Sequence, residues 1–138
     1  EPKSDYAIKC DTVNQHWLNL IGRWLMINPD LIFFIENPRG MLRKMPFMRG
    51  MPRTTVTYCQ YGDNRMKPTD VWSNNLYSIF NITGWASRSM CKNGDSCHEA
   101  SPRGSRTGTQ GRKGNSERSR VPRDLCLDII QASVKVVT

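Results

Sequence analysis

The fold is decided by residues 31–40, LIFFIENPRG, in which five apolar residues are followed at once by a glutamate and then by a proline and a glycine. A short run that is apolar on both faces is typical of a strand buried in a parallel sheet. A helical pattern precedes this run and a polar turn follows it, so the sequence predicts an α/β fold. Ligands in such folds bind outside the carboxyl ends of the strands, which makes Glu36 a candidate site residue.

The segment before this strand is predicted to be a helix. Ser4 or Asp5 is a suitable amino-terminal cap, and the pattern runs to about Ile27. Pro29 ends it, because proline cannot continue the hydrogen-bond ladder of a helix. One face of this helix is apolar at helical spacing and consists of Ile8, Val13, Trp17, Leu20, Ile21, Trp24 and Leu25.

Beyond Gly40 the sequence divides into a core, an irregular region and a closing helix. We expect residues 1–74 to form the core, with a short helix over 41–47 and strands over 53–60 and 70–73. Residues 75–120 lack periodicity and are predicted to be an irregular, basic region. From Val121 a helix is expected to pack back on the core, with Leu125, Cys126, Ile129, Ile130 and Val134 on one face.

The charge of the chain points to nucleic acid as its partner. The net charge is +8 and the isoelectric point is about 9.6, and basic residues bind phosphates with release of counterions. A basic surface in contact with water is the alternative. Residues 101–123 contain seven Lys or Arg residues against one acid, which favours DNA. The DNA-binding candidates are Arg103, Arg106, Arg112, Lys113 and Arg118.

Cysteine usage and hydropathy bear on the compartment. Five cysteines without an export signal argue against a disulfide framework. No apolar run approaches the ~18 residues of a membrane span, so we expect a cytoplasmic protein without membrane contact. The chain begins with Glu1 rather than Met, and we therefore expect it to be a piece of a longer protein.

Three potential metal ligands lie within eight residues of one another. Cys91, Cys97 and His98 surround a turn-forming Asn-Gly pair, and two thiols with an imidazole suit tetrahedral zinc. Cys59, Cys126 or water is a candidate for the fourth ligand. The alternative is a loop of reduced thiols without metal.

Glu36 is the candidate catalytic residue. An acid directly after a buried strand sits where burial and neighbouring groups raise a carboxyl pKa. The alternative is a solvated carboxylate in a turn.

Five runs of the sequence, taken together, carry a further signal. They are residues 36–40 (ENPRG), 58–63 (YCQYGD), 91–94 (CKNG), 101–111 (SPRGSRTGTQG) and 118–126 (RSRVPRDLC). This combination resembles the DNA cytosine-5 methyltransferases, and most closely their phage and prophage branch.

The resemblance implies that the chain is the carboxy-terminal part of a Rossmann-like methyltransferase domain. Such an enzyme transfers a methyl group from S-adenosylmethionine to cytosine in DNA. Glu36 would then bind the flipped cytosine and donate a proton to its ring, which makes carbon 6 electrophilic. Residues that would position the base or its phosphate are Asn37, Arg39, Arg65 and Lys67.

The sequence also departs from the family in two motifs. It contains no Pro-Cys dipeptide for the nucleophile and no Phe-x-Gly-x-Gly loop for S-adenosylmethionine. We therefore expect both parts in an amino-terminal half that precedes Glu1, and we expect these 138 residues to be inactive alone. Cys59 is expected on a strand facing the sheet, where a buried thiol is inert. The alternatives are a zinc-stabilised nucleic-acid-binding module without chemistry, or a remnant that folds only with a partner.

Overall fold

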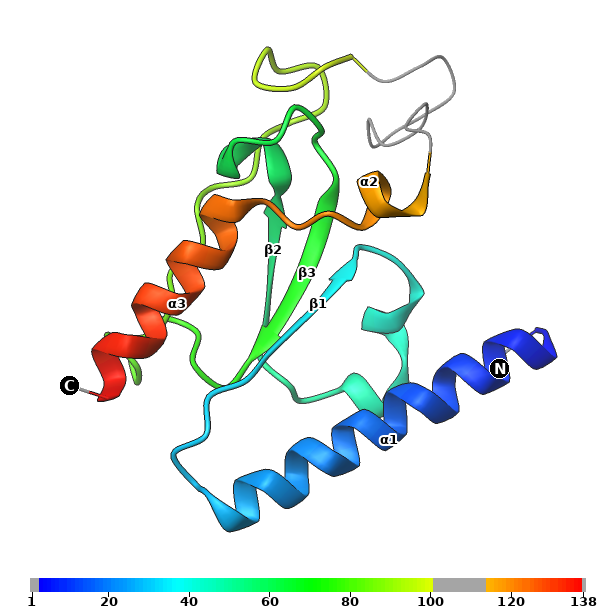
Figure 1. Cartoon of the computed structure of the whole chain (residues 1–138), viewed down its shortest axis with the longest axis vertical. Helices are drawn as coiled ribbons and strands as arrows, with labels where there is room; N and C mark the ends of the chain where they lie inside the picture. Colours follow the sequence, from blue (N-terminus) through cyan, green and yellow to red (C-terminus); the bar gives the residue numbers. More distant parts are fainter. Residues whose placement is uncertain (1–2, 101–113, 138) are drawn as a thin grey trace. The chain divides into compact units, whose positions relative to one another are not determined.

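The computed structural model describes residues 3–100 and 114–137. Contacts divide the chain into two compact units, Glu1–Phe33 and Phe34–Thr138. The first unit contains one helix, and the second contains the sheet and the remaining elements (Figure 1).

The predicted first helix is confirmed as α1 (Asp5–Ile27). Ser4 caps it, since the Ser4 hydroxyl accepts a hydrogen bond of 3.2 Å from the backbone N–H of Ala7. The helix ends as expected before Pro29, and the N–H of Asn28 donates to the carbonyl of Trp24 at 2.8 Å. No residue of α1 is fully buried, so its apolar face remains partly exposed.

Three short strands form an antiparallel sheet in the order β1-β3-β2, namely β1 (Phe34–Pro38), β2 (Arg53–Thr57) and β3 (Pro68–Ser73). The expected parallel strand over residues 31–35 is therefore wrong. β1 runs antiparallel to its partner β3, and the connection between β2 and β3 is too short for the crossover of a dozen or more residues that a parallel pair needs. The fold is α/β only in the loose sense of helices with a small sheet.

Glu36 consequently lies within β1, opposite Val71, rather than beyond the end of a strand, and it is exposed, so the expected burial of its carboxyl group is wrong. The short helix expected over residues 41–47 is two 3-10 turns, η1 (Met41–Lys44) and η2 (Pro46–Met48), because Pro46 interrupts the hydrogen-bond ladder. The strand predicted over residues 53–60 ends at Thr57. There the chain enters the 3-10 turn η3 (Tyr58–Tyr61), which Gly62 closes in the left-handed conformation at φ 85°.

The region after β3 is irregular, as predicted, apart from isolated bridges and the short helix α2 (Asn115–Ser119). The closing helix is confirmed as α3 (Arg123–Val137). Its buried stripe differs from the prediction, because Leu125, Ile129 and Ala132 face the core. The predicted face was wrong for three residues, which are exposed, namely Cys126, Ile130 and Val134.

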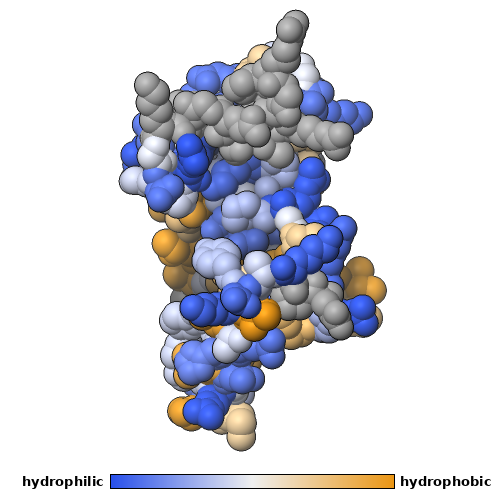
Figure 2. Space-filling view, turned by 90° about the vertical axis from the view of Figure 1, so that its right-hand side faces the viewer, coloured by the Kyte–Doolittle hydropathy of each residue, from blue (hydrophilic) through white to orange (hydrophobic). Residues whose placement is uncertain are grey.

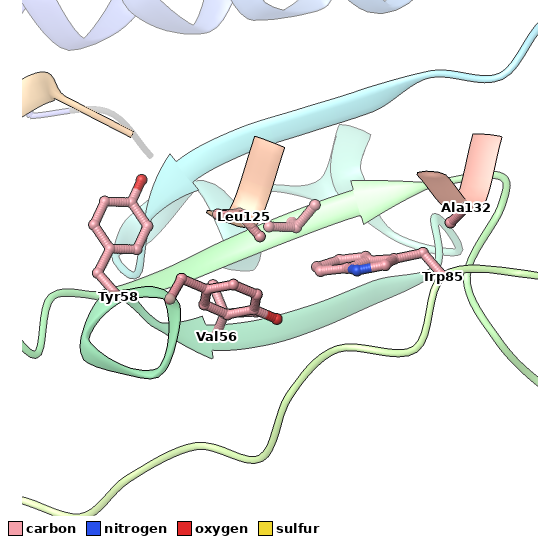
Figure 3. Packing of buried hydrophobic residues seen from close by; sticks show 7 residues of the cluster. Val56, Tyr58, Trp85, Leu125 and Ala132 are labelled. Atoms are coloured by element: carbon pink, nitrogen blue, oxygen red, sulfur yellow. The ribbon is translucent and has the colours of Figure 1, made fainter. Parts of the chain in front are cut away.

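One face of the sheet carries the hydrophobic core, and α3 lies over it (Figures 1 and 3). Val56 and Val71 point from the strands into this core, where they meet aromatic side chains and α3. Burial of this apolar surface stabilises the second unit. The cluster comprises Val56, Tyr58, Tyr61, Val71, Trp85, Leu125 and Ala132.

The opposite face of the sheet is held by a charged network. The carboxylate of Asp70 is fully buried, and it accepts hydrogen bonds of 2.8 Å from Arg43 Nε and from the Thr55 hydroxyl. Burial alone would raise the pKa of Asp70. The hydrogen bonds from Arg43 and Thr55, together with the charge of Arg43, outweigh burial and lower that pKa.

Much of the surface seen in Figure 2 is hydrophilic, with apolar residues in separate places. Among residues 3–100 and 114–137, no helix combines the length and the apolar character that crossing a membrane requires.

Candidate functional site

A cluster of three thiols and one imidazole forms beside the sheet. Cys59 comes from η3, and Cys91, Cys97 and His98 come from the irregular segment after β3. The four potential ligand atoms all lie within 4.8 Å of one another. We call these four residues the thiol cluster, and their donor set could hold a metal ion.

The spacing inside the thiol cluster is close to that of a tetrahedral metal site. Zinc–sulfur bonds of ~2.3 Å and zinc–nitrogen bonds of ~2.0–2.1 Å imply S···S distances of about 3.8 Å and S···N distances of about 3.6 Å. The Sγ atom of Cys59 is 3.1 Å from that of Cys91 and 3.6 Å from that of Cys97. The Nδ1 atom of His98 is 3.6 Å from Cys91 Sγ and 3.4 Å from Cys97 Sγ.

Local backbone interactions bring the ligands of the thiol cluster together. The N–H of Cys91 donates to the Thr57 hydroxyl at 3.0 Å, which joins the ligand segment to the end of β2. The N–H of Lys92 donates to the Asp95 carboxylate at 2.7 Å. Gly94, at φ 96°, then turns the chain back toward Cys97 and His98.

The thiols differ in their readiness to ionise. Burial opposes ionisation of Cys59, but hydrogen bonds to Cys91, Thr57, Cys97 and Gln60 outweigh burial and lower its pKa. Burial and the neighbouring Cys59 and Cys97 thiols raise the pKa of Cys91 to about 12. Several thiolates side by side repel one another, and a cation among them removes that repulsion.

All three predicted ligands, Cys91, Cys97 and His98, therefore come together, and Cys59 is the fourth member. Cys126, the other candidate, is exposed on α3 and is not part of the cluster. The expectation that Cys59 lies on a strand facing the sheet is wrong. Because β2 ends at Thr57, Cys59 lies on η3 and its sulfur faces the other thiols.

A second cluster forms around the ring of Tyr58, the residue before Cys59. The Tyr58 side chain is fully buried, and its hydroxyl donates a hydrogen bond of 2.9 Å to Glu36 Oε1. Lys67 Nζ lies 4.9 Å and Arg65 Cζ 5.8 Å from the centre of the Tyr58 ring, within the range of cation–π attraction. We call Glu36, Tyr58, Arg65 and Lys67 the tyrosine cluster.

The two cations of the tyrosine cluster are buried and bonded within the chain. Arg65 is 4% exposed and pairs with Asp63, with an Nε–Oδ1 distance of 2.9 Å. Its guanidinium also donates to the carbonyls of Glu117 and Arg120 at 2.8 and 3.1 Å. Lys67 Nζ donates to the carbonyl of Arg118 at 2.6 Å. Both cations thus hold the segment that leads into α3.

Lys67 adopts a strained backbone conformation. Its φ of 30° is unusual for a residue other than glycine, and such strain is concentrated at functional sites. Burial lowers the pKa of Lys67, against the attraction of Glu36. Burial, followed by the charge of Glu36, raises the pKa of Tyr58.

Two predicted substrate-binding residues do not join this cluster. The side chain of Asn37 donates to the carbonyl of Pro38, and its strand position faces the side of the sheet opposite Glu36. Arg39 is exposed, and its backbone N–H donates to the carbonyl of Pro68 at 3.0 Å. Sequence reasoning missed the roles of Tyr58 and Asp63, although both lie in the run of residues 58–63 that carries the family resemblance.

Of the predicted DNA-binding residues, Arg103, Arg106, Arg112 and Lys113 lie outside the described residues, and Arg118 is on α2. The described residues that precede and follow positions 101–113 are both bonded to the turn at residues 64–67. Glu99 N–H donates to the carbonyl of Asn64 at 2.8 Å, and the Asn64 side chain donates to the Glu99 carboxylate at 2.6 Å. On the other side, Arg65 and Lys67 hold residues 117–120.

No family model, no curated protein and no solved structure matches this chain. Function is therefore inferred from the sequence motifs and from the geometry of the two clusters.

Proposed function

We propose that this chain is the base-binding, carboxy-terminal part of a DNA cytosine-5 methyltransferase, which transfers a methyl group from S-adenosylmethionine to cytosine in DNA. One observation carries the proposal. Glu36 on β1 and the cations Arg65 and Lys67 just before β3, which the motif resemblance assigns to the base, gather around the ring of Tyr58. The finer assignment to a Rossmann-like domain is part of the same proposal.

In this proposal, Glu36 recognises the Watson–Crick edge of a cytosine that has left the helix. One carboxyl oxygen accepts a hydrogen bond from the exocyclic amine, and the protonated oxygen donates to the ring nitrogen. Attack on carbon 6 builds negative charge in the ring, and the proton from Glu36 neutralises that charge. The hydrogen bond from Tyr58 fixes the rotation of the carboxyl group, and Lys67 contributes positive charge beside it.

The nucleophile and the cofactor site are proposed to come from an amino-terminal half. The sheet of the described residues is antiparallel, so it has no parallel strand whose end could carry a glycine-rich loop for S-adenosylmethionine.

A binding comparison tests the base-binding role directly. Two duplexes would differ at one mismatched position, with cytosine in one and uracil in the other, because a mismatch lowers the cost of flipping. We expect the chain to prefer cytosine, and we expect Glu36→Leu, which removes both the donor and the acceptor, to abolish the preference. Glu117→Leu, the same change on α2, is the matched control. Equal selectivity in Glu36→Leu and the unsubstituted chain would reject the proposal.

For the thiol cluster we propose zinc as the bound ion. Three thiolates and one imidazole are the donors that zinc prefers, and four protein ligands leave no position open for substrate. The proposed role of the metal is thus structural. Zinc content of the purified chain tests it, with one ion per chain expected.

A second candidate function, a zinc-stabilised nucleic-acid-binding module, is favoured by the attachment of both flanks of the basic stretch to the turn at residues 64–67. In either function the chain should bind DNA with strong salt dependence. If ~4 basic residues contact phosphates, log affinity should fall with log salt at a slope near −3.6. A titration without salt dependence would contradict both candidates, whereas loss of cytosine selectivity in Glu36→Leu would favour the methyltransferase.

A further inference from the structure

The two clusters are joined through η3. Tyr58 and Cys59 are neighbours in sequence, yet the hydroxyl of Tyr58 reaches Glu36 while the sulfur of Cys59 reaches the other thiols. Both residues lie on one 3-10 turn. The position of Cys59 therefore bears directly on the position of Tyr58.

A second connection runs from the other end of the thiol cluster. His98 is followed directly by Glu99, which makes two hydrogen bonds with Asn64, through its own N–H and through the Asn64 side chain. Asn64 precedes Arg65, a member of the tyrosine cluster. The thiol cluster thus holds residues 58–67 at Cys59 and, through Glu99, at Asn64.

Between these two attachments the segment is closed by its own backbone. The N–H of Tyr58 donates to the carbonyl of Met66 at 2.7 Å, and the N–H of Asp63 donates to the carbonyl of Tyr58 at 3.2 Å. Residues 58–67 therefore form a small loop that carries Tyr58, Arg65 and Lys67 together. The loop also contributes Tyr58 and Tyr61 to the hydrophobic core, so the thiol cluster is one of several attachments that hold it.

We propose that a zinc ion bound by Cys59, Cys91, Cys97 and His98 fixes this loop, and that metal occupancy thereby sets the Tyr58–Glu36 hydrogen bond at the base-binding site. That this site binds a base rests on the proposed function. The coupling between the metal and the loop is inferred from geometry alone. The ion links η3 to residues 91–98 and closes a loop of the chain between Cys59 and Cys91. Such a cross-link restricts the freedom of the segments that it joins.

A disulfide is a poorer explanation of the same geometry. The Cys59 and Cys91 sulfur atoms are 3.1 Å apart, well beyond the ~2.05 Å of a disulfide bond. A disulfide would also leave Cys97 and His98 without a reason to converge on the same point. A single ion at the centre uses all four side chains.

The test measures zinc content and backbone hydrogen exchange on the full chain. The unsubstituted protein should contain one zinc per chain, and replacement by cobalt should give the absorption of a tetrahedral thiolate site. Removal of zinc by a chelator should speed exchange of the Tyr58 amide at least tenfold, while amides of β3 stay protected. Addition of zinc should restore the slow exchange of Tyr58.

Two variants separate the metal from general effects of substitution. Cys97→Ser removes an exposed ligand with little loss of packing, and it should lose zinc and speed Tyr58 exchange. Cys126→Ser, an exposed thiol outside the cluster, should change neither quantity. If Cys97→Ser fails to fold, the chelator experiment on the unsubstituted chain decides the question.

The possible failures are distinguishable. A chain purified without zinc that also fails to take up zinc or cobalt would overturn the metal site. A chain that binds zinc but whose Tyr58 exchange is unchanged by chelation would overturn the coupling. Neither readout involves cytosine, so a chain that passes both tests and yet shows no cytosine selectivity would overturn the proposed function alone.

Discussion

The tyrosine cluster and the thiol cluster begin at adjacent residues but are completed in different ways. In the tyrosine cluster, Glu36 accepts from Tyr58, Arg65 pairs with Asp63, and Lys67 donates to a main-chain carbonyl. In the thiol cluster, the sulfur and nitrogen atoms face one another. Protein groups alone therefore complete the first cluster, whereas the second presents four donor atoms that could hold a metal ion.

The strongest test of this comparison is methyl transfer by the chain alone. If Cys59 is a metal ligand rather than a nucleophile, these 138 residues should transfer no methyl group, even with S-adenosylmethionine and DNA in excess. Methylation needs a thiolate at carbon 6 and a sulfonium held beside carbon 5, and positioning supplies much of the rate. Labelled methyl incorporation that Cys59→Ser abolishes would make Cys59 the nucleophile and erase the distinction between the clusters.

The next largest effect is expected at Glu36 when the chain is combined with an amino-terminal half that restores activity. Glu36→Gln should lower the rate of methyl transfer by ~10²–10⁴-fold, the usual contribution of a general acid. DNA affinity should change little, because basic residues supply most of it. Glu117→Gln should leave both quantities unchanged. Full activity in Glu36→Gln would remove Glu36 from the chemistry.

The Asp70 network on the other face of the sheet allows a test of how much a buried charge contributes to stability when protein groups pair with it. Asp70→Asn leaves Arg43 without its carboxylate, and we expect a loss of about 3 kcal/mol in the free energy of unfolding. Chemical denaturation of both proteins measures this loss.

The same network predicts an acid dependence. Because the folded-state pKa of Asp70 is lowered, its contribution is fully present above the unfolded pKa of about 3.9. It is lost as the pH falls through the lower folded pKa. Asp70→Asn should therefore flatten the acid limb of stability. An unchanged acid limb would show that Asp70 does not carry it.

The sequence predicted the elements with strong local signals. Helix α1 follows from its apolar spacing, the Ser4 cap and Pro29, and α3 follows from Pro122 and its apolar residues. Three of the four members of the thiol cluster were predicted because they lie within eight residues of one another. These features depend on interactions between residues that are close in the chain.

The features that depend on distant contacts were not predictable in the same way. The apolar run before Glu36 does not indicate whether the neighbouring strand is parallel or antiparallel. Its neighbour is β3, and the two strands run antiparallel. Cys59 was one of three candidates for the fourth ligand, because the end of β2 at Thr57 decides where its sulfur points. The Tyr58–Glu36 hydrogen bond spans 22 residues and has no local signature.

The smallest expected effect concerns Gln60, whose side-chain amide donates to Cys97 Sγ at 3.4 Å. A hydrogen bond to a metal-bound thiolate stabilises its negative charge, and loss of such an outer partner typically costs ~10–100-fold in metal affinity. We expect Gln60→Ala to weaken zinc binding about tenfold, the lower end of that range, because this contact is exposed. Competition with a chromophoric chelator measures the change.

The fold should be retained, because Gln60 is only half-buried and lies outside the hydrophobic core. An unchanged affinity would mean that the cluster is held by its four ligands without outer support, whereas a loss as large as that of Cys97→Ser would make Gln60 a required part of the site.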